Sequence, residues 1–230
     1  MSNLSRSGIR AIIVQSVLII LAFAVLFISA GTLAWVNAWI YFGLIVLDWV
    51  ISEVVLAKIN PEVLNGRGSV VRAGTKGFDK IGLVLVPLPT ICGLVVMGFD
   101  AVRFKWSSMP SWLTIIGIVM VIPACAGGIW VMIVNKFFEW TARLQDDRKH
   151  YVCTSGPYRI IRHPGYAGYI VTKLAYPLIL GSWWGFLPEG ILIILFIIRT
   201  ALEDRTLHNE LPGYKDCAGK VKYRLVLFIW

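Results

Sequence analysis

The sequence predicts an all-α integral membrane protein, a helical bundle with about six transmembrane helices. Hydrophobic residues make up 57% of the 230-residue chain and charged residues only 15%, which is too apolar for a soluble domain of this length. Long apolar stretches also recur along the chain, each close to the roughly 20 residues that a bilayer core requires. No internal repeat or separate soluble region interrupts this pattern, so residues 1–230 are expected to form a single transmembrane domain.

Four spans are expected in residues 1–138. The first apolar run is longer than the core of a signal peptide, and a second follows almost at once, so a cleaved leader fits less well than a span. Pro87 and Pro89 are expected to kink the third span. The expected spans are Ile9–Ala30, Ala34–Ala57, Ile81–Phe99 and Trp112–Phe138, with an irregular surface loop at Lys58–Lys80 and a short outer loop at Asp100–Pro110.

Residues 139–230 combine polar motifs with a final helical hairpin, expected at Tyr166–Leu180 and Trp184–Thr200. His163 precedes a proline, which disfavours helical geometry and places the start of the fifth span there. Arg199 and Glu203 are four residues apart, so they share a helix face and are expected to point into one pocket. Asp204 does not share that face, so we expect Asp204→Ala to weaken binding in the pocket less than Glu203→Ala does.

The basic residues are distributed unevenly about the expected spans. Of the 22 lysines and arginines, only Arg103 and Lys105 fall in the outer loop, and the other 20 fall on the opposite side. The positive-inside rule then places both termini and the motif region in the cytoplasm. We therefore expect the C-terminal half to form a cytoplasmic cofactor pocket. The same distribution explains the net charge of +9 without a nucleic-acid partner.

Several other polar residues could mark a site. The four cysteines form no CxxC pair and the three histidines show no ligand spacing, so neither a disulfide framework nor a metal site is expected. Asp48 and Glu53 lie within the second span, where acids are costly and usually face the bundle interior. They could serve the pocket, although for Glu53 a structural partner such as Lys58 is the simpler explanation.

The order and spacing of the motifs over about Gln145 to Tyr223 resemble the isoprenylcysteine carboxyl methyltransferase family and its phospholipid methyltransferase relatives. The sequence departs from the family in two places, since Asp204 stands for the second Glu of a pair and Gln145 is closer to His150 than in eukaryotic enzymes. The end of the chain, KVKYRLVLFIW, resembles that of prokaryotic members. The matching residues are His150–Cys153, Thr154–Tyr158 (TSGPY), Arg162–Gly168 (RHPGYAG), Arg199, Glu203–Leu207 and Gly213–Tyr214.

The resemblance implies a methyltransferase that uses S-adenosyl-L-methionine as cofactor. It also implies a lipid or prenylated small-molecule acceptor taken from the bilayer, with Arg199 holding the acceptor carboxylate, in a multi-pass protein of a prokaryotic inner membrane. The cofactor contacts that it implies are Gln145, His150, Tyr151, Val152, Cys153, Tyr158, His163, Pro164, Gly165, Tyr166 and Glu203.

Three alternatives remain open from the residues. A phospholipid amine N-methyltransferase would have no use for Arg199. A membrane reductase of the sterol reductase type would bind NADPH through basic residues, and it would need no Gly-rich dinucleotide motif, which this sequence lacks. A non-catalytic scaffold or transporter would use Asp48 and Glu53 as pathway acids.

Overall fold

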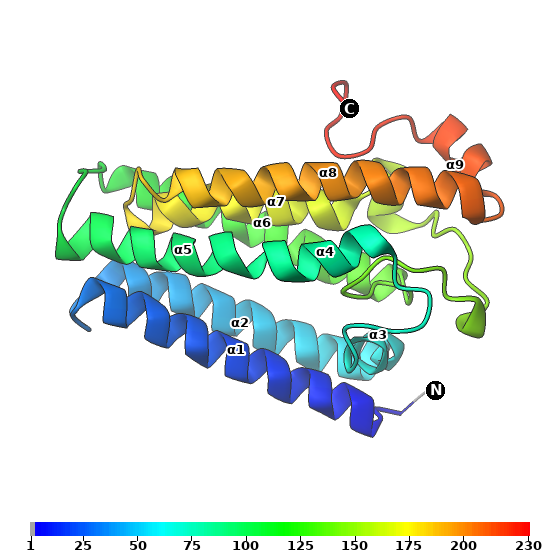
Figure 1. The fold of residues 1–230 in the computed structure, drawn as a ribbon, viewed down its shortest axis with the longest axis horizontal. Coiled ribbons are helices and arrows are strands. Elements are labelled where there is room, and N and C mark those ends of the chain that lie inside the picture. Colours follow the sequence, from blue (N-terminus) through cyan, green and yellow to red (C-terminus); the bar gives the residue numbers. More distant parts are fainter. Residues whose placement is uncertain (1–2) are drawn as a thin grey trace.

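The computed structural model describes residues 3–230 and contains helices but no strand in that range, which confirms the predicted all-α class. The long helices run side by side along one direction (Figure 1). The elements are α1 (Arg6–Ala30), α2 (Val36–Ile59), α3 (Pro61–Arg67), α4 (Gly77–Leu85), α5 (Pro87–Gly98), the π-helical turn η1 (Phe99–Arg103), α6 (Trp112–Val134), the 3-10 turns η2 (Asp146–Arg148) and η3 (Gly156–Arg159), α7 (Pro164–Leu180), α8 (Phe186–Glu210) and α9 (Tyr214–Lys220).

Four helical segments in the described residues are long and apolar enough to cross a membrane: α1, α2, the run from α4 to η1, and α6. They correspond to the four spans predicted in the N-terminal half. Helices α7 and α8 lie alongside them (Figure 1), but α7 has only 17 residues and α8 carries several charged side chains in its second half. The total of six crossings therefore stays a prediction.

Two prolines and the continuation of one helix explain where several element boundaries differ from the predicted ones. The segment expected as a loop at Lys58–Lys80 contains α3, because Pro61 occupies its first turn and is pre-organised for a helix. Helix α4 ends at Leu85 and Pro87 begins α5, so the helix is interrupted where a kink is predicted, and the kink itself stays a prediction. The following helix continues through η1 to Arg103, so the outer loop is shorter than predicted.

The main apolar core lies toward one end of the bundle. It gathers the C-terminal residues of α1, α5 and α7 with the first turns of α2 and the middle of α6. Gly117 allows α6 and α7 to approach closely, because a Cβ there would lie 2.7 Å from a side-chain carbon of Ile179. This close packing holds α7, the partner of α8 in the final hairpin, against α6 at the core end. Loops form the opposite end of the bundle.

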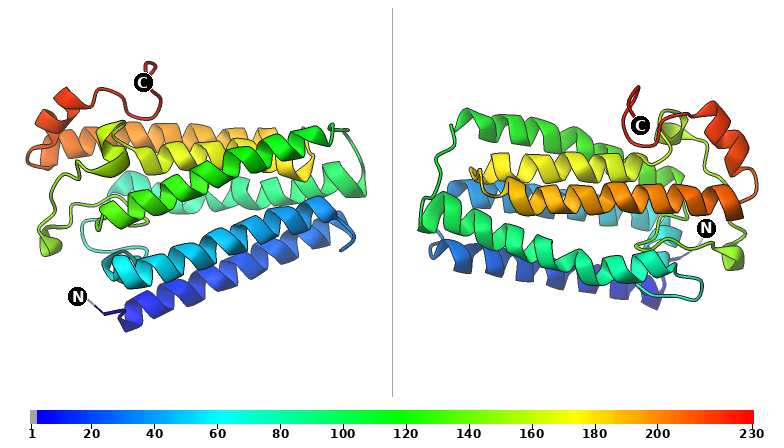
Figure 2. Two further views of the ribbon diagram at one scale, coloured as in Figure 1. Left: turned by 180° about the vertical axis from the view of Figure 1, so that it is seen from behind. Right: turned by 45° about the horizontal axis from the view of Figure 1, so that its top comes forward.

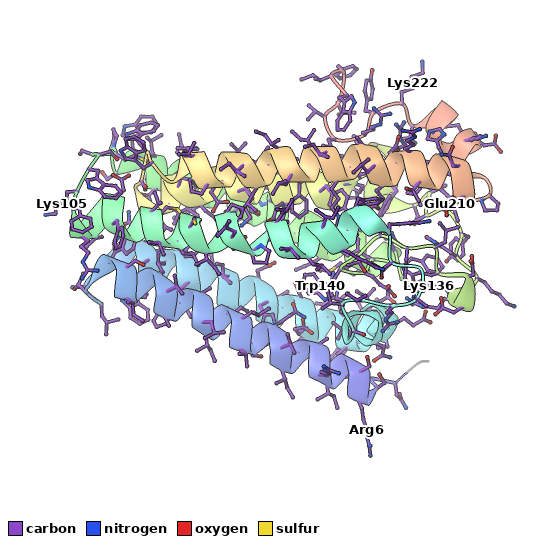
Figure 3. All side chains as sticks on the ribbon, in the orientation of Figure 1. Arg6, Lys105, Lys136, Trp140, Glu210 and Lys222 are labelled. Atoms are coloured by element: carbon purple, nitrogen blue, oxygen red, sulfur yellow. The ribbon has the colours of Figure 1, made fainter. Side chains whose placement is uncertain are left out.

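The loops and short helices gather at that opposite end. Helices α3 and α9, the start of α1 and the C-terminal segment lie there in the two views of Figure 2. Figure 3 shows Lys105 at the core end and Lys136 and Glu210 toward the loop end. The basic residues other than Arg103 and Lys105 thus concentrate at one end, apart from Lys173, which is buried within α7 and lies 3.6 Å from Glu189.

The two acids of α2 have different surroundings. Glu53 accepts a 3.1 Å hydrogen bond from Gln15 of α1 rather than pairing with Lys58, which corrects the predicted partner. Asp48 lines a small cavity between α2, α6 and α7 together with Tyr41, Cys125 and Tyr176. Neither acid lines the larger cavity described below, so the structure does not place them in the candidate site.

Candidate functional site

A cavity at the loop end of the bundle contains most of the predicted site residues. Its empty volume, including the mouth that opens to solvent, is about 990 Å³. The walls come from the segment after α6, the start of α7, the second half of α8 and the beginning of α9. The residues that line it include Asn135, Phe137, Phe138, Glu139, Ala142, Arg143, Gln145, His150–Cys153, Tyr158, Arg162, His163, Gly165, Tyr166, Glu203 and Tyr214.

Asn135 turns the chain from α6 into the cavity wall. It ends α6 in an extended conformation, and its side-chain oxygen accepts from the backbone N–H of Phe137 at 3.0 Å. Its amide nitrogen donates to the hydroxyl of Tyr158 at 2.7 Å. Because that hydroxyl accepts from Asn135, its own proton is free to be donated into the cavity. Burial raises the pKa of Tyr158, so the hydroxyl keeps this proton at neutral pH.

Gln145 shapes the wall beneath His150. It is 2% exposed, and its side chain donates to the carbonyl of Phe137 at 2.7 Å and accepts from Arg148 at 2.8 Å. Its backbone N–H points at Nδ1 of His150, 3.4 Å away. Nδ1 therefore acts as an acceptor and the proton of the neutral ring sits on Nε2. Burial lowers the pKa of His150, which favours this neutral form.

A network of ion pairs holds the loop after α6 in place. Glu139 contacts three arginines, with Nε of Arg143 at 2.9 Å, Arg148 at 3.4 Å and Arg72 at 3.7 Å. Arg143 also pairs with Asp147 at 2.8 Å, and hydrogen bonds from Arg143 lower the pKa of that aspartate. Glu139 and Arg143 are almost fully buried, so these charges stabilise the loop and are not free to bind a ligand.

Asp204 is the most highly connected acid of the site. It is 1% exposed, and Arg162, Arg224 and Tyr214 each donate to its carboxylate at 2.8 Å, while Nε2 of His163 lies 3.3 Å away. Burial alone would raise the pKa of Asp204, but the hydrogen bonds from these four side chains hold it well below its usual range. Asp204 therefore joins α8 to α7, α9 and the C-terminal segment.

The C-terminal segment completes this cluster through its backbone. The N–H groups of Arg162 and His163 donate to the carbonyls of Tyr223 and Arg224 at 2.9 Å. His163 has the non-helical geometry that the following proline favours, and it is the residue before the first turn of α7, as predicted. Its ring stacks on that of Tyr166 with the planes 4° apart. The aspartate thus fixes His163, and His163 supports Tyr166 at the cavity wall.

Tyr166 separates Glu203 from Arg199. Its hydroxyl donates to a carboxylate oxygen of Glu203 at 2.5 Å, and the guanidinium of Arg199 lies over its ring, 5.1 Å from the centroid. Arg199 itself is paired with Asp79 of α4, with Nε 2.9 Å from one carboxylate oxygen and Nη2 donating to the other at 3.0 Å. Glu203 therefore lines the cavity, whereas Arg199 lies one layer behind its wall.

The structure brings together ten of the eleven predicted cofactor contacts on one cavity wall. Pro164 is the exception, because it forms the first turn of α7 and serves to start that helix. Arg199 is also absent from the wall, so it does not share one pocket with Glu203 as the helical spacing predicted. Whether the residues on the wall bind a cofactor stays a prediction.

Sequence reasoning missed Asp79 and the structural weight of Asp204. Asp79 lies 120 residues before Arg199, and the only signal in the sequence was an acid among glycine and lysine just before an apolar run. For Asp204 the sequence did contain a signal. Arg162 and Arg224, two basic residues of the C-terminal part of the chain, needed a buried acidic partner.

One comparison with known proteins gives a match that overlaps this region of the chain. A family model described as the isoprenylcysteine carboxyl methyltransferase (ICMT) family matches residues 115–209. The matched region contains most of α6, the loop after it, α7 and nearly all of α8, and therefore most of the cavity wall, including Glu203, as well as Arg199 behind that wall. No curated protein matches the chain. The match supports a membrane methyltransferase.

Proposed function

We propose, from the premise that residues 115–209 match the isoprenylcysteine carboxyl methyltransferase family, that the chain is an S-adenosyl-L-methionine-dependent methyltransferase. Its acceptor is lipid-like and reaches the site from the bilayer, and the reaction is carboxyl O-methylation of an isoprenylcysteine-like molecule. The observation that carries the proposal is the single cavity at the loop end, which unites Glu203 with the segment from Gln145 to Tyr166.

The chemistry of the cavity wall fits this cofactor. Glu203 supplies a carboxylate for the ammonium group of the methionine part, and Tyr158 and Nε2 of His150 supply donors for its carboxylate or ribose hydroxyls. Phe137 and Tyr151 contact each other edge to face at 4.9 Å and offer aromatic surface for the adenine or the sulfonium. Each of these groups lines the same cavity and comes from the matched region.

The proposed reaction asks the protein mainly for alignment. When bound, the cofactor supplies an activated methyl group, and a carboxylate acceptor is already anionic at neutral pH, so no general base is required. The protein has to hold the carboxylate oxygen in line with the methyl group and to exclude water. Tyr166 lies on the cavity wall and Arg199 lies one layer behind it, so these two side chains would orient an acceptor that enters from the membrane side.

A second acceptor class is favoured by one observation. Asp79 neutralises Arg199 in the structure, and a neutral pair places no net positive charge behind Tyr166. An amine head group would not be repelled by such a pair. N-methylation of a phospholipid amine is therefore the second candidate, with the same cofactor and the same cavity.

Binding of labelled cofactors to the purified protein tests the proposal. In lipid nanodiscs the chain should bind S-adenosylmethionine saturably and should not bind NADPH. Glu203→Gln provides the matched control, because it keeps the shape of the side chain and removes its charge. Binding of NADPH in place of S-adenosylmethionine would favour a reductase and refute the methyltransferase. Transfer of a tritiated methyl group to an N-acetyl-S-prenylcysteine, compared with a phosphatidylethanolamine, then identifies the acceptor class.

A further inference from the structure

We propose that Asp79 occupies the place of the acceptor carboxylate on Arg199 and is displaced when an acceptor binds. Asp79 would then set how strongly the enzyme discriminates carboxylate acceptors from neutral ones. This inference rests on the proposed carboxyl methyltransferase function and on Arg199 as the residue that binds the acceptor.

The contacts of Arg199 are those of an arginine that already holds a carboxylate. Nε of Arg199 lies 2.9 Å from one carboxylate oxygen of Asp79, and Nη2 donates a 3.0 Å hydrogen bond to the other, so the ion pair engages both oxygens although only Nη2 makes a hydrogen bond. The carbonyl of Trp140 accepts a further 2.7 Å hydrogen bond from Nη2. Within the described residues, Nη1 donates to no protein group, so one edge of the guanidinium remains for a second anion.

The two partners differ in exposure. The side chain of Asp79 is 3% exposed, whereas that of Arg199 is 20% exposed. Part of the Arg199 side chain is therefore open to a ligand, whereas Asp79 is enclosed. Because the planar fork of an arginine holds one carboxylate in bidentate geometry on a given edge, a second carboxylate gains full contact only as Asp79 gives way. Asp79 thus competes with an acceptor for the same cation.

The other contacts of Asp79 link this competition to the cavity. The backbone N–H of Ala142, which lines the cavity, donates to the same Asp79 oxygen that accepts from Arg199. Next to it, the N–H of Lys76 donates to the carbonyl of Ala142 at 3.1 Å. The start of α4 therefore fastens the cavity wall to α8 through one carboxylate. Release of Arg199 by Asp79 would leave the bond to Ala142 in place, so the wall need not open.

An isosteric replacement of Asp79 separates competition from simple support. Asp79→Asn leaves Arg199 without its counter-ion in a mostly buried place, which strongly favours an incoming anion. If Asp79 competes, the KM for N-acetyl-S-prenylcysteine should fall at least about tenfold, equivalent to 1.4 kcal/mol of lost competition. The affinity for S-adenosylmethionine should not change. If Asp79 only supports the fold, the KM should rise or stay constant.

Glu210→Gln is the matched control. Lys76, the residue before α4, and Glu210 of α8 form a further ion pair at 2.6 Å, and neither contacts Arg199. Loss of this exposed pair should leave both KM and cofactor affinity as in the wild type, because exposed pairs contribute little. A fall in KM in this variant as well would mean that looser attachment of α4, and not the loss of competition, causes the effect, and would overturn the proposal.

A comparison on the wild-type protein keeps the proposal testable if Asp79→Asn does not fold. The acid and the corresponding carboxamide of the prenylcysteine, measured as competing ligands, should bind within about tenfold of each other, because the acid must replace an internal carboxylate. A preference for the acid above about a hundredfold would overturn the proposal. Failure of the wild type to transfer methyl groups from S-adenosylmethionine is a separate result, which refutes the proposed function rather than the competition.

Discussion

The hydroxyl of Tyr166 lies 2.5 Å from a carboxylate oxygen of Glu203, and this hydrogen bond joins the start of α7 to the second half of α8. The same ring carries Arg199 on its face and stacks against His163. One tyrosine therefore touches the acid proposed for the cofactor, the arginine proposed for the acceptor and the histidine held by Asp204. The acid proposed for the cofactor therefore contacts the hydroxyl of Tyr166, and the arginine proposed for the acceptor contacts the face of its ring.

Tyr166→Phe should weaken cofactor binding and also loosen the attachment of α7 to α8. The substitution keeps the ring that stacks on His163 and removes the donor to Glu203, a charge-assisted hydrogen bond worth about 1.5–3 kcal/mol. We expect the affinity for S-adenosylmethionine, measured by calorimetric titration, to fall about tenfold or more. Tyr176→Phe, in the same helix but outside this cavity, is the control and should bind as the wild type does. Equal affinities of Tyr166→Phe and the wild type would show that Glu203 does not depend on this donor.

Glu203→Gln and Asp204→Asn should have opposite profiles. Glu203 lines the cavity and is held there by Tyr166, so its neutralisation should abolish cofactor binding with little change in thermal stability. Asp204 is buried among Arg162, Arg224, His163 and Tyr214, and breaking such a pair typically costs about 3–5 kcal/mol. Thermal unfolding in detergent and cofactor titration on the same samples separate the two effects. An Asp204→Asn variant as stable as the wild type would contradict the role of Asp204 in joining α8 to α7, α9 and the C-terminal segment.

The helices were accessible to sequence reasoning because their determinants are local, whereas the residues of the cavity were implied by the family resemblance. Apolar runs of bilayer length predicted α1, α2, the run from α4 to η1, and α6, and the proline after His163 predicted the start of α7. The predicted cofactor contacts fall in one short motif region and one helix, so their common cavity needed only that these two segments meet.

The partner of Arg199 and the role of Asp204 were not accessible, because both depend on how distant segments pack. Helical spacing relates Arg199 to Glu203 but does not show that Asp79 of α4 lies beside them. The same spacing placed Asp204 away from the pocket. It could not show that Arg162, more than forty residues earlier, and Arg224, from the C-terminal segment, meet on that other face.

The loop end of the bundle should face the cytoplasm. Basic residues concentrate at this end, and only Arg103 and Lys105 lie in the outer segment. In a variant without the native cysteines, Ser69→Cys should react with a membrane-impermeant thiol reagent only after the membrane is permeabilised, whereas Ser108→Cys should react in intact cells. Both positions are exposed. The reverse labelling pattern would place the cavity and both termini outside and would exclude cytoplasmic cofactor supply.

The stability of the protein should fall as the pH drops below about 6.5, and His150 should account for part of that fall. Burial lowers the pKa of His150 from its ordinary value of 6.5, so near that pH the unfolded chain binds a proton that the folded chain takes up less readily. Stability therefore rises with pH through this window, and the unfavourable contribution of His150 disappears above it.

The cause is visible in the site. Protonation would put a proton on Nδ1 and remove the acceptor for the N–H of Gln145, next to the ring of Phe137, whose centroid is 4.5 Å from that of His150. His150→Gln carries no titratable group. Its unfolding temperature should therefore depend less on pH between about 5.5 and 7.5, the window around the ordinary histidine pKa. Thermal unfolding of both proteins across this range, with cofactor absent, gives the two slopes. Parallel slopes would mean that His150 titrates alike in the folded and unfolded chains, and that the contact with Gln145 does not select the neutral ring.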